Sequence, residues 1–308
     1  MIEVVMAMML AAQEPEEVTV AGPDGPLAGT LSGPAEGPAM VLIPGSGPTD
    51  RDGDNMLALK GKVFVQLADA LNRQGIAVLR YDKRGMFGSA AAIANGNDVT
   101  LDAYADDARA FVDLLRDRGR DCVWLAGHSE GGVVALTEAA RNPEGLCGVL
   151  LLATPGRPLL NVIESQLDGQ IPEAWMELTV AGLDALRAGE TFDVETLPAP
   201  LRPMFNPSIQ PYLIDLGAAD PAALAGRVAV PMLIVSLGED VQVMEADADA
   251  LSAGQPGATR VDIPGVNHAF KPVRQGATRM ENIATYADAD LTIDPAVATA
   301  IAAFIKAE

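Results

Sequence analysis

The chain has 308 residues, of which 49% are hydrophobic and 20% charged, and 42 acidic against 21 basic residues give a net charge of −21. This composition is typical of a globular protein and excludes a largely disordered chain. The acidic balance argues against nucleic acid as a partner, because phosphate binding needs a basic surface.

Residues 1–16 form a separate N-terminal segment. From Val4 to Ala12 the chain is almost wholly apolar and ends in small residues, as in the later part of a secretory signal, although Glu3 stands where such signals carry Lys or Arg. We interpret 1–16 as a signal-peptide remnant, which predicts a periplasmic or secreted protein. The alternative is an ordinary N-terminal segment of a cytoplasmic protein. No later run reaches the ~20 apolar residues that span a bilayer, so no membrane span is expected.

The following segments alternate between predicted strands and predicted helices. A Pro-Asp-Gly turn joins two short strands in a hairpin over 18–34. Short apolar runs predict buried strands, and apolar residues three and four apart predict amphipathic helices. The strands are expected over 39–45, 76–85, 122–127 and 145–156, and the helices over 60–75, 101–118 and 131–141. This order favours a mostly parallel sheet with helices on both faces.

The alternation stops between 157 and 227. This stretch holds eight of the 22 prolines and several short helical pieces, with no convincing strand. Strand and helix patterns resume at 230–240 and 259–265, and a closing helix is expected over 295–307. We therefore predict one α/β core made of 17–156 and 228–308, with 157–227 inserted as a helical cap. Insertions at the carboxyl edge of a parallel sheet lie where ligands bind in such folds.

The chain has two cysteines, Cys122 and Cys147, and each begins a short apolar run. If the two predicted strands are neighbours, a disulfide is geometrically feasible in an oxidising compartment. Free cysteine is, however, commonly buried as a small apolar side chain. We expect two buried thiols.

The stretch Gly127-His128-Ser129-Glu130-Gly131 fits the pattern G-x-S-x-G between a predicted strand and a predicted helix. A sharp strand-to-helix turn needs glycines there, because a Cβ would collide with the neighbouring element. Such a turn lifts the serine hydroxyl above the sheet at a helix N-terminus. The alternative is a tight turn with a solvated serine. The position of the motif favours Ser129 as a catalytic nucleophile.

A serine nucleophile needs a base, and the chain has only two histidines. His128 adjoins the serine and is expected to point away from it into the packing. His268, in the loop after the last predicted strand, is therefore the predicted base. The acid that orients the imidazole should lie between them in sequence, after a strand. Asp240 is preferred, and Glu239 is the alternative.

The developing oxyanion needs two backbone donors. We predict the N–H groups of Glu130, which follows the nucleophile, and of Ser46, in the small-residue loop after strand 39–45. In the same loop Asp50, Asp52 and Asp54 alternate like the start of a calcium loop. The required glycine and the glutamate at the twelfth position are missing, so we expect no metal site and interpret the aspartates as a charged network that braces the loop.

Six stretches together resemble bacterial α/β-hydrolases of the serine-esterase and serine-aminopeptidase-like group. They are LIPGSGPTDRDG, VLRYDKRGMFGS, LAGHSEGG, FNPSIQPYL, VPMLIVSLGEDVQV and IPGVNHAFK, in family order across about 18–306. The resemblance implies the α/β-hydrolase fold and the same assignment of Ser129, Asp240, His268, Ser46 and Glu130. Leu237 stands where relatives tend to have glycine, and for this reason Glu239 remains the alternative acid. Asp82 and Arg84 in RYDKRG are expected to brace the end of a strand.

The predicted function is hydrolysis of small carboxylic esters through an acyl-enzyme, without a cofactor. The alternatives are a peptidase, an amidase or a carbon–carbon hydrolase with the same triad, or a non-catalytic binding protein of this fold. The candidates for substrate contact in the cap are Trp175, Met176, Met204, Phe205 and Tyr212. Their alternative role is to form the small core of the cap itself.

Overall fold

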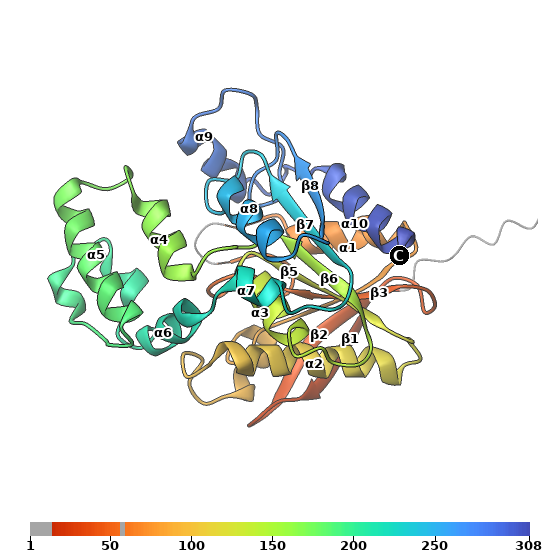
Figure 1. Ribbon diagram of the computed structural model, residues 1–308. Coiled ribbons are helices and arrows are strands. Elements are labelled where there is room, and N and C mark those ends of the chain that lie inside the picture. Colours follow the sequence, from red (N-terminus) through yellow and green to blue (C-terminus); the bar gives the residue numbers. More distant parts are fainter. Residues whose placement is uncertain (1–13, 56–58) are drawn as a thin grey trace, which may run out of the picture.

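The computed structural model describes residues 14–55 and 59–308, so the apolar run of the predicted N-terminal segment lies outside the described residues. Its centre is an eight-stranded sheet in the order β1-β2-β4-β3-β5-β6-β7-β8 (Figure 1). The strands are β1 Glu16–Ala21, β2 Pro26–Ser32, β3 Ala39–Ile43, β4 Ala77–Tyr81, β5 Val123–His128, β6 Leu146–Leu152, β7 Met232–Leu237 and β8 Thr259–Ile263.

The sheet is mostly parallel, as the alternation of elements predicts. β1 and β2 form an antiparallel hairpin, and β2 pairs antiparallel with β4. From β4 through β3, β5, β6 and β7 to β8, every neighbouring pair is parallel. The carboxyl ends of these strands therefore meet at one edge of the sheet, where the predicted site residues follow them in the sequence.

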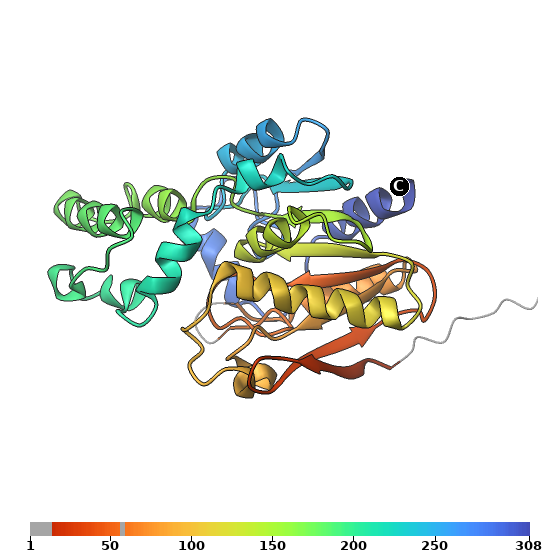
Figure 2. The same ribbon diagram turned by 60° about the horizontal axis from the view of Figure 1, so that its bottom comes forward.

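Helices cover both faces of the sheet (Figure 2). One apolar cluster joins α2 and α3 to alternate strand residues such as Val41, and a second cluster joins α1 and α10 to the residues between, such as Met40. This alternation follows from the two-residue repeat of a strand that is buried on both faces. The helices of the core are α1 Val63–Asn72, α2 Leu101–Asp117, α3 Glu130–Ala139, α8 Glu245–Gly254, α9 Arg279–Ala284 and α10 Pro295–Ala307.

A group of helices projects from the carboxyl edge of the sheet, and Figure 1 shows it in green at the side away from the C-terminus. It contains α4 Leu159–Leu167, α5 Glu173–Arg187 and α6 Gln210–Ala218, followed by the short α7 Pro221–Ala225. α4, α5 and α6 share an apolar cluster of their own, which includes Leu160, Leu183 and Phe205. Their insertion point lies between β6 and β7, which nevertheless pair directly.

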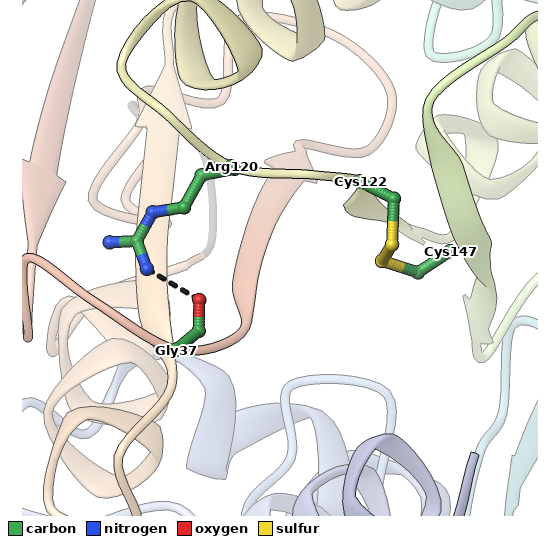
Figure 3. The surroundings of a disulfide bond; sticks show 4 residues. All are labelled: Gly37, Arg120, Cys122 and Cys147. Atoms are coloured by element: carbon green, nitrogen blue, oxygen red, sulfur yellow. Dashed lines mark hydrogen bonds between the residues drawn. A yellow bond between two sulfur atoms is a disulfide. The ribbon is translucent and has the colours of Figure 1, made fainter.

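Cys122 and Cys147 form a disulfide, so the expectation of two free thiols is wrong (Figure 3). Cys122 directly precedes β5 and Cys147 is the second residue of β6, and these strands are neighbours. Their Cα atoms are 5.2 Å apart, which is within the usual range for a disulfide. The bond lies at the amino edge of the sheet, where Arg120 also hydrogen-bonds the carbonyl of Gly37.

In the two stretches that the structure describes, no helix is both long enough and apolar enough to cross a membrane.

Candidate active site

Ser129 occupies a sharp turn between β5 and α3. Its backbone has φ 54° and ψ −127°, a conformation that is strained for a residue with a side chain. A Cβ on Gly127 would lie 2.1 Å from the carbonyl oxygen of Gly131, and a Cβ on Gly131 would lie 2.4 Å from the carbonyl oxygen of Ile43. The two glycines of the motif are therefore required by close backbone contacts, and the turn holds Ser129 at the N-terminus of α3.

His268 and Asp240 are in direct contact. His268 Nδ1 lies 2.6 Å from Asp240 Oδ2, and the two side chains are 5% and 1% exposed. The other carboxylate oxygen of Asp240 accepts hydrogen bonds from the backbone N–H groups of Gln242 at 2.7 Å and Val243 at 2.9 Å. These donors fix the carboxylate, so it can hold the imidazole in one orientation.

Glu239 takes a different place in the same turn. Its backbone N–H donates to the carbonyl of Val266 and its own carbonyl accepts from Asn282, so the contacts of this residue are made by its main chain. The carboxylate that reaches His268 is that of Asp240, although Leu237 replaces the glycine of the resembling sequences. The backbone N–H of Asp240 donates to the carbonyl of Leu237, which closes the turn after β7.

His128 packs beneath the site, as expected for the residue before the predicted nucleophile. Its ring makes edge contacts with Phe64 and Phe270, at centroid distances of 5.5 and 4.8 Å. Its Nε2 lies 2.8 Å from the carbonyl oxygen of His268. Burial, and secondarily the neighbouring His268, hold the pKa of His128 well below its ordinary value. His268 thus lies against the residue that adjoins Ser129.

The loop after β3 approaches the serine closely. A Cβ on Gly45 would lie 3.1 Å from the Cβ of Ser129, so a side chain at this position would crowd Ser129. Ser46 and Glu130, the two predicted oxyanion donors, line the same cavity as Ser129. Both predicted donor residues therefore border the cavity that Ser129 lines.

This cavity has a volume of about 350 Å³. One wall is apolar and comes from the helices inserted after β6, through Leu159, Val162, Ile163, Met204, Ile209 and Leu213. Ser129 and the polar side chains of Lys83, Tyr104 and Glu130 also line the cavity. A ligand in the cavity would present an apolar group to the helices and its polar centre to Ser129.

The five candidates for substrate contact divide into two groups. Met204 and Tyr212 line the cavity. Phe205 is fully buried in the apolar cluster of the inserted helices, and Trp175 and Met176 pack against that cluster. Phe205, Trp175 and Met176 therefore belong to the small apolar core of the inserted helices.

The aspartates of the loop form a charged network. Asp50 accepts from the backbone N–H groups of Asp52 and Asp54, both at 2.9 Å, and Asp52 pairs with Arg80 and, at 3.2 Å, with Lys62. These bonds occupy the carboxylates with protein donors. Among the residues that the structure describes, no group of three His, Cys, Asp or Glu could hold a metal ion.

The neighbouring strand end is braced as well. Asp82 accepts from the backbone N–H groups of Arg51 at 2.8 Å and Gly88 at 3.0 Å, and Arg84 forms two bonds to Asp107, at 2.6 and 2.7 Å. The expectation for Asp82 and Arg84 is confirmed.

Lys83, between these two residues, also belongs to the site, although the sequence does not single it out. Its side chain is 2% exposed, and its ammonium lies 3.3 Å from Glu130 Oε1. In the sequence, only its position just after a buried strand indicates that Lys83 could reach the site. Asp82 and Arg84 have the same kind of position. Which of three consecutive polar residues turns inward depends on tertiary contacts.

The family described as serine aminopeptidase, S33, matches residues 58–191. The esterase EstD of Thermotoga maritima is 33% identical over 248 residues, which are 77% of this chain and 54% of EstD. The bifunctional esterase/perhydrolase DCH of Acinetobacter calcoaceticus is 33% identical over 106 residues, 34% of this chain and 36% of that protein. The chain thus spans about half of EstD and a third of DCH.

Solved structures with the same architecture are similar to this chain over most of its length. An esterase from Pyrococcus furiosus has a TM-score of 0.59 at 14% identity and covers 96% of this chain and 91% of its own. Est1E from Butyrivibrio proteoclasticus, solved with ferulic acid, has a TM-score of 0.56 at 19% identity and covers 87% of this chain and 97% of its own. At these identities the similarity establishes a shared fold.

Proposed function

We propose that this chain, which has the α/β-hydrolase fold and is similar to the serine aminopeptidase family and to the esterase EstD, hydrolyses carboxylic esters through an acyl-enzyme on Ser129. The observation that carries the proposal is the 2.6 Å contact between His268 Nδ1 and Asp240 Oδ2, beside the strained turn of Ser129. A nucleophile, a base and an orienting acid then lie together at one edge of the sheet.

The first half of the reaction forms the acyl-enzyme. Ser129 Oγ attacks the ester carbonyl carbon while His268 Nε2 accepts the hydroxyl proton, and Asp240 stabilises the resulting imidazolium. The carbonyl oxygen becomes an oxyanion, which accepts hydrogen bonds from the backbone N–H groups of Ser46 and Glu130. The intermediate collapses with cleavage of the bond to the alkoxy oxygen, and His268 gives its proton to the departing alcohol.

The second half restores the enzyme. A water molecule loses a proton to His268 and attacks the acyl carbon, and the same two N–H groups stabilise the second oxyanion. Collapse breaks the bond to Ser129 Oγ, which recovers the proton from His268 as the carboxylic acid leaves. Every proton that moves is carried by the substrate, water, Ser129 or His268.

The substrate we propose is a small ester with an apolar acyl group. The apolar wall built by α4 and α6 and the cavity volume of about 350 Å³ support this class. On this basis 157–227 is a cap over the site, and 17–156 with 228–308 is the catalytic core. The cap contributes selectivity for the acyl group and the core contributes the chemistry.

A peptidase is the second candidate, and the match to the serine aminopeptidase family favours it. An aminopeptidase must bind a free α-amino group, for which a carboxylate is the natural partner. The carboxylate of Glu130 lines the cavity, but the Lys83 ammonium lies 3.3 Å from it. This pairing is why we prefer the ester.

One assay series distinguishes the two candidates. Purified protein is offered p-nitrophenyl esters from acetate to decanoate and, in parallel, aminoacyl p-nitroanilides. The ester proposal expects turnover of the esters, with a maximum at one chain length, and covalent labelling of Ser129 by an alkyl phosphonate in mass spectrometry. Faster turnover of the anilides would replace it with the peptidase, and a protein that neither turns over nor is labelled would contradict both.

We further propose that the protein works outside the cytoplasm, in the periplasm or after secretion. The disulfide between Cys122 and Cys147 supports an oxidising compartment, since reducing conditions keep such thiols free. Alkylation of the protein from its native source, followed by mass measurement, tests this. Two alkylated cysteines without prior reduction would contradict the proposal.

A further inference from the structure

Lys83 is a buried cation in the wall of the active site. It follows β4, is 1% exposed, and its Nζ donates to the carbonyl oxygen of Gly45 at 2.7 Å. The ammonium also lies 3.3 Å from Glu130 Oε1 and 5.2 Å from the centroid of the Tyr104 ring. A buried charge is unfavourable unless it is paired and hydrogen-bonded, and here the partners come from three separate segments of the chain.

The bond to Gly45 fixes a particular peptide group. The carbonyl of Gly45 and the N–H of Ser46 belong to one trans peptide, so they point in opposite directions. When the ammonium holds the carbonyl, the Ser46 N–H points away from Lys83, in the opposite direction within the same peptide plane. A cation on the carbonyl oxygen also strengthens the N–H of the same peptide as a donor. The loop at this point is close to the proposed nucleophile, since a Cβ built on Gly45 would lie 3.1 Å from the Cβ of Ser129.

The second contact reaches the other proposed donor. Glu130 carries the backbone N–H at the start of α3, and its side chain is 5% exposed. The first turn of a helix favours a carboxylate, which then provides a partner for the ammonium. Lys83 thus contacts the carbonyl of the peptide that carries the Ser46 N–H, and the side chain of the residue that carries the other N–H.

We propose that Lys83 is the positioning residue of the oxyanion hole, because it fixes the Ser46 and Glu130 N–H groups relative to each other. The inference rests on the proposed ester hydrolysis. Lys83 does not itself bind the oxyanion, and its action passes through the two peptide groups. The contribution is therefore made to the tetrahedral intermediate and not to the ground-state substrate.

Tyr212 connects the inserted helices to this arrangement. Its hydroxyl lies 3.0 Å from Glu130 Oε1, and its ring meets Tyr104 edge to face at 5.7 Å. Burial, and then the Glu130 carboxylate, raise the pKa of Tyr212 well above its ordinary value, so the phenol stays protonated and donates to Glu130. Tyr212 from α6 and Lys83 from the core therefore hold the same carboxylate oxygen.

The test compares Lys83→Met and Lys83→Arg with wild type on a p-nitrophenyl ester. Loss of one oxyanion donor typically lowers kcat by about 10²–10³. We expect Lys83→Met to lose kcat on this order with KM within about threefold, and Lys83→Arg to recover part of the loss. Lys306→Met, on the exposed end of α10, is the control and should match wild type.

Two inhibitors separate positioning from a merely structural role. An alkyl trifluoromethyl ketone forms a tetrahedral adduct with an oxyanion, whereas the matching methyl ketone binds without forming one readily. Lys83→Met should lower the affinity for the trifluoromethyl ketone by about the same factor as it lowers kcat. Its affinity for the methyl ketone should stay unchanged. The inference would be overturned if the affinities for both inhibitors fell equally, or if KM rose while kcat stayed unchanged.

A folding control keeps the test decisive. Lys83→Met leaves the buried Glu130 carboxylate without its cation, so Lys83→Met/Glu130→Gln is made as well and should fold while showing the same selective loss. If the wild type neither hydrolyses esters nor reacts with the phosphonate, the proposed function fails. If the wild type is active and both Lys83 variants keep full affinity for the trifluoromethyl ketone, only the inference about Lys83 fails.

Discussion

His128 Nε2 lies 2.8 Å from the carbonyl oxygen of His268, so one hydrogen bond joins the only two histidines of the chain. A carbonyl only accepts, and therefore Nε2 of His128 carries the proton. Burial holds the pKa of this imidazole well below its ordinary value, so the ring is neutral. The histidine beside the proposed nucleophile thus supports the backbone of the proposed base.

The first prediction concerns pH and His128. Below about pH 6.5 the unfolded chain protonates His128 while the folded chain does not, so stability falls as the pH falls. This single group contributes a slope of at most about 1.4 kcal/mol per pH unit. His128→Phe keeps an aromatic ring against Phe64 and Phe270 but cannot titrate.

Urea unfolding of wild type and His128→Phe between pH 5 and 8 measures this slope. The variant should be less stable by about 1–3 kcal/mol at pH 8, because the His268 carbonyl loses its donor. The difference between the two proteins should shrink as the pH falls below 6.5. Parallel stability curves would show that His128 is not buried as the neutral form.

The second prediction tests the nucleophile and the base. Ser129→Ala and His268→Ala should each lower esterase turnover by about 10⁶, because the members of a triad act as a unit. His128→Ala, at the adjacent position, should retain measurable turnover and lose about 2–4 kcal/mol of stability. The measurements are kcat on a p-nitrophenyl ester and urea unfolding. An active His268→Ala with an inactive His128→Ala would assign the base to the other ring.

The third prediction concerns the acid. Asp240→Asn should lower kcat by about 10⁴, since the imidazole is then held in the wrong tautomer, while Glu239→Gln should stay within about tenfold of wild type. Both variants keep the size of the side chain, so each serves as control for the other. The opposite ranking would move the acid to Glu239.

The fourth prediction concerns the disulfide. Replacing Cys122 and Cys147 together by alanine releases a loop with a sequence separation of 25 residues, which is expected to lower the free energy of unfolding by about 2–4 kcal/mol. Turnover at 25 °C should not change, because the bond lies at the amino edge and the residues of the proposed triad follow the carboxyl ends. Loss of activity in a fully folded double variant would contradict this separation.

The regular elements of the core were predictable because each carries its signal locally. The closing helix over 295–307 has the predicted bounds, and β7 lies inside the strand expected at 230–240. The helix expected over 60–75 is shorter, at Val63–Asn72, because Gly61 and Lys62 have positive φ and the chain turns again after Arg73. Periodicity marks the centre of such an element better than its ends.

The features that sequence reasoning missed depend on which elements are neighbours. The cysteines form a disulfide because β5 and β6 are adjacent in the sheet. The sequence of neither strand reveals which strands are its neighbours. Lys83 contacts Gly45 and Glu130 because β3 lies between β4 and β5 in the sheet. The burial of Phe205, and the packing of the half-buried Trp175 and Met176 against the same cluster, likewise follow from how α4, α5 and α6 pack on one another.

The direct pairing of β6 with β7 has a consequence for how this protein could diversify. The chain leaves the sheet after β6 and rejoins it at β7, and these two strands are hydrogen-bonded to each other. The inserted helices are therefore not needed to complete the sheet. If 157–227 is the cap that we propose, a substitute insert of another length or shape would change the selectivity of the pocket and leave the framework intact. The bond from Tyr212 to Glu130 sets one condition on such an exchange: the new insert must supply its own donor to that carboxylate.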